Sequence, residues 1–167
     1  MEERQRRAWA EVSLDNLAHN YRAIRELLPP GCLFMGMVKS DAYGHGAIAV
    51  SRALSALGAE YLGVACLDEA LELRRGGISL PILILGSTDP LYVPELLEHG
   101  LTQTVYDLDT ARVLSEQAQR AGGELVVHLK ADTGMSRLGF LCDEEHLAQS
   151  ARGLGEAYRL PGLRPEG

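Results

Sequence analysis

The chain has 167 residues, of which 46% are apolar and 23% are charged, and its formal net charge is −7. This composition is typical of a globular protein large enough to bury a core of its own. The acidic balance argues against a nucleic-acid-binding protein, which needs a basic face. The three cysteines form no C-x-x-C pair and show no zinc spacing, which indicates a reducing, cytoplasmic environment.

Membrane and metal sites are not predicted. No apolar run is long enough for a membrane-spanning helix, and no apolar stretch follows the charged first residues, so we expect no signal peptide. The histidines are scattered without the spacing of metal ligands, so we expect no bound metal.

Helix-like and strand-like segments alternate along the chain. Apolar residues at helical spacing predict a first helix over residues 14–28, which Pro29, Pro30 and Gly31 end. Apolar runs then predict strands at residues 33–38, 61–65, 81–85, 101–106 and 125–130. Between and after them, helical patterns occupy residues 47–57, 68–75, 91–98, 109–120 and about 143–158. Because these strands are apolar throughout, we expect them to be buried on both faces of a parallel sheet.

The order of the elements indicates an α/β fold. Strand followed by helix, several times over, is the pattern of βα units with right-handed crossovers. Asp68 and either Asp107 or Asp109 are predicted helix N-caps, and glycines follow several of the helices. Periodicity does not distinguish an open doubly wound sheet from a barrel. The absence of a G-x-G-x-x-G motif after the first strand disfavours a dinucleotide-binding fold.

Lys39 is the residue of greatest chemical interest. It ends an apolar run, and an ammonium in that position is partly desolvated, which favours the neutral, nucleophilic amine. Gly44 and Gly46 follow it and allow the backbone to pass close to a bound group. Taken alone, such a lysine more often marks the point where a strand reaches solvent.

Two long segments change that interpretation. The segment VKSDAYGHG (residues 38–46) resembles the cofactor-lysine segment of alanine racemases, and HLKADTGMSRLG (residues 128–139) resembles a second segment of that family. The opening WAEV (residues 9–12) is a weaker match, and the resemblance covers essentially the whole chain.

The resemblance implies a (β/α)8 TIM-type barrel followed by a β-rich C-terminal domain. On this expectation residues 1–12 are a leading segment, and residues 13–167 are the N-terminal part of the barrel. We count about five βα units, so the barrel is expected to be incomplete and truncated before its sixth strand, with the C-terminal domain absent.

The resemblance also implies the site residues. Lys39 would carry pyridoxal 5'-phosphate as a Schiff base, Tyr43 would bind the cofactor phosphate, and Leu85 would line the cofactor cleft. Arg137 would bind an oxygen anion of the cofactor or substrate through two guanidinium donors. Without the resemblance, Tyr43 and Leu85 would be interpreted as packing residues and Arg137 as a surface residue.

Lys130 lies seven residues before Arg137 and would place a second cation beside it. In the family the matching lysine is carbamylated, so the resemblance implies an N6-carboxylysine at Lys130 that pairs with Arg137. Asp132 and Thr133 are interpreted as loop-shaping residues rather than acid/base groups.

The implied function is the interconversion of L-alanine and D-alanine, which supplies D-alanine for peptidoglycan in the bacterial cytoplasm. In the family the second acid/base group is a tyrosine from the C-terminal domain of the other subunit, so we expect a homodimer of the full-length enzyme and an inactive fragment. Two alternatives remain open: another barrel-type pyridoxal-phosphate racemase or decarboxylase, and a cofactor-binding protein without turnover.

Overall fold

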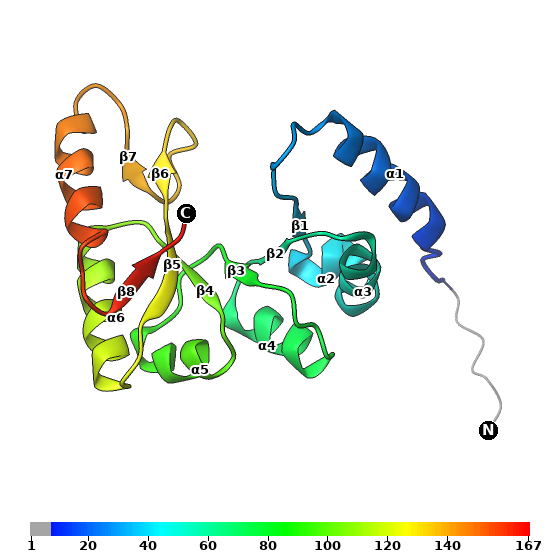
Figure 1. The fold of residues 1–167 in the computed structure, drawn as a ribbon, viewed down its shortest axis with the longest axis horizontal. Coiled ribbons are helices and arrows are strands. Elements are labelled where there is room, and N and C mark those ends of the chain that lie inside the picture. Colours follow the sequence, from blue (N-terminus) through cyan, green and yellow to red (C-terminus); the bar gives the residue numbers. More distant parts are fainter. Residues whose placement is uncertain (1–7) are drawn as a thin grey trace.

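Six parallel strands in one sheet form the framework of the protein (Figure 1). The computed structural model describes residues 8–167, so the first seven residues of the predicted leading segment lie outside the described residues. The strands are β1 (Met35–Met37), β2 (Tyr61–Val64), β3 (Ile82–Ile84), β4 (Thr102–Val105), β5 (Leu125–Leu129) and β8 (Leu163–Pro165). Each strand is hydrogen-bonded in parallel to the next in this order.

The helices alternate with the strands, and α1 precedes β1 whereas the others follow a strand. They are α1 (Leu14–Leu27), α2 (Lys39–Gly44), α3 (Ala47–Leu57), α4 (Leu67–Arg75), α5 (Val93–Glu98), α6 (Leu108–Arg120) and α7 (Leu147–Ala157). A 3₁₀ turn, η1 (Pro90–Tyr92), leads into α5, so the helix predicted over residues 91–98 is divided in two. Figure 1 shows α3 to α6 along the outside of the arc that the strands describe.

The strand order distinguishes the two folds that the sequence left open. The spatial order β1-β2-β3-β4-β5-β8 is also the order in the chain, so each crossover adds the next strand on the same side. In a doubly wound sheet the order reverses and helices cover both faces. Successive addition with the helices outside is the arrangement of a (β/α)8 barrel, which confirms the predicted, incomplete barrel.

The described barrel has one strand more than predicted. The expectation that the chain stops before the sixth strand is wrong, because β8 pairs with β5 from Leu125↔Leu163 to Val127↔Pro165. Prolines and a glycine around this short segment obscured it, since proline is depleted in strands. Pro165 is tolerated because β8 lies at the edge of the described sheet, where a missing backbone donor breaks no ladder on the outer side.

The core lies between the sheet and the outer helices. Leu62, Ile82, Ile84 and Leu125 on the strands and Leu114 on α6 are at most 1% exposed. Burial of a side chain of this size contributes about 1.5–3 kcal/mol. Gly36 allows α3 to approach β1, because a Cβ at this position would lie 2.5 Å from Leu54. These contacts fix the ends of the strands, where the predicted site residues lie.

A small second pair of strands closes the loop after β5. In this pair β6 (Ala131–Asp132) lies beside β7 (Phe140–Leu141), and neither strand was predicted. The backbone N–H of Phe140 donates to the Lys130 carbonyl at 2.8 Å, and that of Cys142 donates to the Asp132 carbonyl at 2.9 Å. Residues 133–139 therefore leave and return at the end of β5, with Arg137 in the loop.

Candidate active site

Lys39 lies two residues after the end of β1 and precedes a left-handed turn. The four residues from Ser40 to Tyr43 have φ between 51° and 55° and ψ between 38° and 51°. None of them is glycine, and this conformation costs an L-amino acid about 1–2 kcal/mol per residue. We predicted that Gly44 and Gly46 allow the backbone to pass close to a bound group, and both have positive φ, at 82° and 88°. The left-handed run before them, at residues that are not glycine, was not predicted.

Hydrogen bonds within the segment stabilise this turn. The Ala42 N–H donates to the Val38 carbonyl at 2.9 Å, and Ala42 is buried. The Asp41 carboxylate accepts from the Ala47 N–H at 2.6 Å and so satisfies an amide at the start of α3. His45 Nδ1 lies 2.9 Å from the Ala42 carbonyl. The strained conformation is thus surrounded by specific partners, as strained backbone at functional sites usually is.

Glu69, in the first turn of α4, contacts the same turn from outside. One carboxylate oxygen accepts from the Ser40 N–H at 2.7 Å, and the other accepts from the Ala65 N–H at 2.7 Å. Glu69 therefore connects the segment after β1 with the segment after β2. Sequence analysis missed this residue, because its partner Ser40 is 29 residues away and no local pattern marks the contact.

Asp132 organises the loop that carries Arg137. Its carboxylate accepts from the backbone N–H groups of Gly134, Ser136 and Arg137 at 2.9, 3.0 and 3.1 Å. These bonds, led by the one from Ser136, hold the pKa of Asp132 below its ordinary value of 3.8, since they favour the charged form. Asp132 is 5% exposed, which agrees with the predicted loop-shaping role.

The structure brings Lys39, Leu85 and Arg137 to one cavity of about 190 Å³. Ala65, Gly86 and Leu138 complete its lining. These residues follow β1, β2, β3 and β5, so the cavity lies at the C-terminal ends of the strands, where barrels place their active sites. Ligand pockets measure about 300–1,000 Å³. At about 190 Å³, this cavity is smaller than that range, so the described residues line only part of a pocket of the usual size.

The other two predicted residues, Tyr43 and Lys130, are not part of the lining of this cavity. Tyr43 is 60% exposed, and the Lys39 Nζ lies 5.8 Å from the centre of its ring, a distance at which a cation and a ring attract each other. Lys130 is half-buried directly after β5, where its N–H donates to the Val105 carbonyl at 2.8 Å. Within residues 8–167, no ion pair involves Lys39, Lys130 or Arg137.

A polar cluster connects strands that are not neighbours in the sheet. Tyr61 at the start of β2 donates to Glu166 after β8 at 2.5 Å, and its hydroxyl lies 2.5 Å from that of Thr102 on β4. His128 on β5 approaches Glu166 at 3.6 Å. Burial, followed by the hydrogen bond to Glu166, raises the pKa of Tyr61 to about 12. Sequence analysis missed this cluster, because Tyr61 and Glu166 are 105 residues apart.

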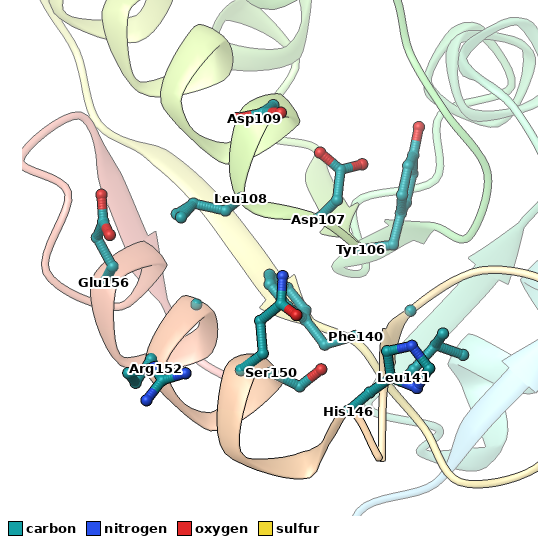
Figure 2. A pocket seen from close by; sticks show the side chains of 13 residues that line it. Tyr106, Asp107, Leu108, Asp109, Phe140, Leu141, His146, Ser150, Arg152 and Glu156 are labelled. Atoms are coloured by element: carbon teal, nitrogen blue, oxygen red, sulfur yellow. The ribbon is translucent and has the colours of Figure 1, made fainter. Parts of the chain in front are cut away.

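A larger cavity of about 610 Å³ lies elsewhere, between the start of α6, β7 and α7 (Figure 2). It contains none of the five predicted site residues. Acidic Asp107 and Glu156 and basic Arg152 line it together, and Glu156 already pairs with Arg112. Its mixed charges do not converge on one ligand chemistry. We therefore place the candidate active site at the smaller cavity, where an amine, a guanidinium and strand ends meet.

The comparison with protein families decides the relationship. The family model described as "Alanine racemase, N-terminal domain" matches residues 12–167. The chain belongs to this family. Among curated relatives, the alanine racemase of Desulforamulus reducens is 45% identical over 95% of the chain and 42% of its own length. The alanine racemase of Desulfovibrio desulfuricans is 46% identical over 83% of the chain and 38% of its own length. The chain thus spans about two fifths of the length of these relatives.

Solved structures support the same relationship. An alanine racemase from Clostridium difficile 630 in complex with cycloserine superposes with a TM-score of 0.90 at 39% identity, over 99% of the chain and 44% of that structure. A histidine racemase from Leuconostoc mesenteroides superposes with a TM-score of 0.76 at 31% identity, over 90% of the chain and 39% of that structure. These matches confirm both the family and the partial barrel that the sequence predicted for this alanine racemase domain.

Membrane-spanning helices and clusters of metal-binding side chains are both absent from the described residues. No helix within residues 8–167 combines the length and the apolar character needed to cross a membrane. The same part of the chain contains no group of three or more His, Cys, Asp and Glu side chains arranged to bind a metal ion.

Proposed function

We propose that this chain provides the cofactor-lysine side of a pyridoxal-phosphate-dependent alanine racemase, which interconverts L-alanine and D-alanine and supplies D-alanine for peptidoglycan. One observation carries the proposal. Lys39 and Arg137, which lie far apart in the sequence, line one cavity at the C-terminal strand ends of a member of the alanine racemase family.

The residues around the cavity fit pyridoxal phosphate chemically. Lys39 offers a primary amine for the aldehyde, Arg137 offers donors for an oxygen anion, and Leu85 offers an apolar surface for a ring. The hydroxyl of the exposed Tyr43 would bind the phosphate. Backbone lies close to the cavity at Gly86, where a Cβ would lie 2.5 Å from the Ala65 carbonyl oxygen. The absence of a side chain at Gly86 therefore allows the segments after β2 and β3 to lie close together at the cavity wall.

The proposed reaction assigns a separate task to each residue. When bound, pyridoxal phosphate withdraws electrons from the Cα of an amino acid and so makes its proton acidic. The Lys39 amine removes this proton from one face of Cα and returns it there. Arg137 orients the bound groups, and Leu85 keeps water from one side of the cavity.

Racemisation also needs an acid/base group on the opposite face of Cα. Among the described residues that line the cavity, Lys39 carries the one amine, and the only other charged side chain is the guanidinium of Arg137, which does not give up its proton. The second group must therefore come from outside this lining. The proposal assigns it to the tyrosine of a second subunit that the family resemblance implies, so the active protein is a homodimer.

Lys130 belongs to the same proposal as an N6-carboxylysine. Lys130 and Arg137 flank the Asp132 loop, and neither forms an ion pair with a carboxylate within residues 8–167. The Lys130 ammonium would release one proton to solvent, and its amine would then add carbon dioxide and release a second proton, which gives a carbamate anion that can pair with Arg137. The intact mass of the Lys130 peptide, prepared without acid, tests this modification. An unmodified amine in the active protein would refute it.

A racemase for another amino acid is the second candidate. It is favoured by the match to a histidine racemase at 31% identity, a protein of similar fold that is named for a different amino acid. The test is a racemisation assay with the purified full-length protein, pyridoxal phosphate and a panel of L-amino acids that includes alanine and histidine. We expect alanine to react fastest. Faster turnover of another amino acid would favour the second candidate, and no turnover of any would contradict both.

A further inference from the structure

Glu69 joins two strand ends beside the Lys39 cavity. Its carboxylate accepts the N–H of Ser40, the residue after Lys39, and the N–H of Ala65, which lines the cavity. Both distances are 2.7 Å, which is short for an N–H···O bond and typical of a charged acceptor. Glu69 is in the first turn of α4, where the helix dipole favours a negative charge.

These two bonds begin where the ladder between β1 and β2 ends. The last register pair is Met37↔Gly63, and the last ladder-like bond runs from the Val38 N–H to the Gly63 carbonyl. Beyond this point, no further backbone hydrogen bond between these two segments is described, and Lys39 and Ala65 line the cavity. Glu69 therefore connects the two segments just after their backbone hydrogen bonds end. By accepting from both N–H groups, its carboxylate holds Ser40 near Ala65.

The left-handed turn needs such a contact. The other hydrogen bonds described for residues 39–46 run within residues 38–50. The bond from the Ser40 N–H to Glu69 is the one described for this segment that reaches a different strand–helix unit. The Ser40 N–H is also part of the peptide group attached to the Cα of Lys39. A partner at this N–H fixes the plane of that peptide and, with it, the direction in which the Lys39 side chain leaves the backbone.

We propose that Glu69 is the positioning residue of Lys39 and directs its amine into the cavity. The effect on cofactor capture rests on the proposed function, whereas the orientation of Lys39 does not. Neither oxygen of Glu69 can be replaced by a donor, because both accept backbone N–H groups. Glu69→Gln preserves the shape of the side chain but turns an NH₂ group toward one of the two amides.

The first experiment uses the two lysines of the chain, Lys39 and Lys130, as an internal pair. The full-length protein without cofactor, in buffer freed of carbon dioxide so that the Lys130 amine carries no carboxyl group, is labelled with a trace of an amine-reactive acetylating reagent, and the Lys39:Lys130 ratio is measured by peptide mass spectrometry. In Glu69→Gln the ratio should rise about tenfold, the factor expected from losing one hydrogen bond to a charged group, because Lys39 turns toward solvent. The matched control is Glu72→Gln. Glu72 is exposed on the same helix, accepts no described side-chain hydrogen bond, and should leave the ratio unchanged.

The second experiment adds pyridoxal phosphate and borohydride to the same proteins. Capture on Lys39 should fall about tenfold in Glu69→Gln, so the two measurements move in opposite directions. A residue that only stabilises the fold would raise the labelling of both lysines together. An unchanged ratio in folded Glu69→Gln would overturn the positioning role. A shifted ratio with no capture in the wild type would support the positioning role and contradict the proposed function.

Glu69→Gln also needs a folding safeguard. If this variant does not accumulate as folded protein, hydrogen exchange of the wild-type full-length protein decides. The Ser40 amide should then exchange at least about tenfold more slowly than an unstructured amide, since it is bonded to a carboxylate. Exchange at the unstructured rate would overturn the proposal.

Discussion

The Lys39 turn and the Arg137 loop meet at one cavity but are held in different ways. Asp132 accepts N–H groups two, four and five residues ahead, so the Arg137 loop is stabilised from within. The Lys39 turn is left-handed at four non-glycine residues and is held by Glu69 from a helix 29 residues away. The difference shows that the Arg137 loop can form locally, whereas the Lys39 turn depends on the completed β1–β2–α4 packing.

The largest effect is expected from a change at Lys39, because the proposal assigns proton transfer to Lys39 and binding to Arg137. Lys39→Arg in the full-length protein keeps a cation but removes the primary amine, and a guanidinium stays protonated and cannot act as the base. Turnover of alanine should fall by about 100- to 10,000-fold, the range that a general acid/base group contributes. Racemisation followed by circular dichroism measures this, with the melting temperature as the control for folding. Turnover within a few-fold of wild type would remove Lys39 from the proposed reaction.

Arg137→Ala should have a smaller effect of another kind. The side chain is exposed, so its removal should leave the melting temperature unchanged. The dissociation constant of pyridoxal phosphate, from absorbance titration, should rise about tenfold or more through loss of charge-assisted hydrogen bonds. Arg75→Ala is the matched control, because Arg75 is an exposed arginine at the C-terminal end of α4 and does not line the cavity. Equal affinities in the two variants would contradict the placement of Arg137 at the cofactor.

Asp132→Asn tests whether the Arg137 loop is held from within. The pKa of Asp132 is lowered in the folded protein, so its stabilising contribution is present above pH 3.8 and is lost as the pH falls through the folded value. The melting temperature should therefore drop by a few degrees at pH 7, and the difference from wild type should shrink as the pH falls below 3.8. Asp68→Asn, an exposed change on α4, should show neither effect. A difference that does not depend on pH would refute the carboxylate's role.

Tyr61→Phe should give the smallest effect, because Tyr61 lies away from both turns. Loss of its hydroxyl should lower the free energy of unfolding by about 1 kcal/mol. The pKa of Tyr61 is raised from 10.0 to about 12, so its contribution is fully present below pH 10 and is lost as the pH rises toward 12. Denaturant melts at pH 8 and pH 11 measure both effects, with the exposed Tyr158→Phe as control. Equal alkaline sensitivity in wild type and Tyr61→Phe would exclude this tyrosine as the cause.

Local patterns predicted much of the fold. The helix over residues 47–57 was predicted correctly, and of the two N-caps left open, Asp107 and Asp109, the structure has Asp107, because apolar spacing and capping side chains act over a few residues. The loop-shaping role of Asp132 could also be inferred from the sequence, since its partners follow it directly. Asp68 was not the N-cap of α4, because the helix begins at Leu67 and Cys66 occupies the cap.

The contacts that position Lys39 could not be predicted in the same way. Glu69 appears in the sequence as one acidic residue among several in the first turn of a helix. Its partner amides belong to segments that approach it only after β1 and β2 pair. The left-handed run from Ser40 to Tyr43 is equally hidden, since residue preferences favour glycine at such angles. The resemblance identified Lys39, but the means of its orientation required the structure.

The central claim is that Lys39 is the amine that binds the cofactor. The most direct test is borohydride reduction of the full-length protein loaded with pyridoxal phosphate, followed by peptide mapping. Since Lys39 and Lys130 are the two lysines of this chain, the assignment has two possible outcomes within it. The account predicts the reduced cofactor on Lys39, with Lys130 free of it. Cofactor on Lys130, or on neither lysine, would contradict the account.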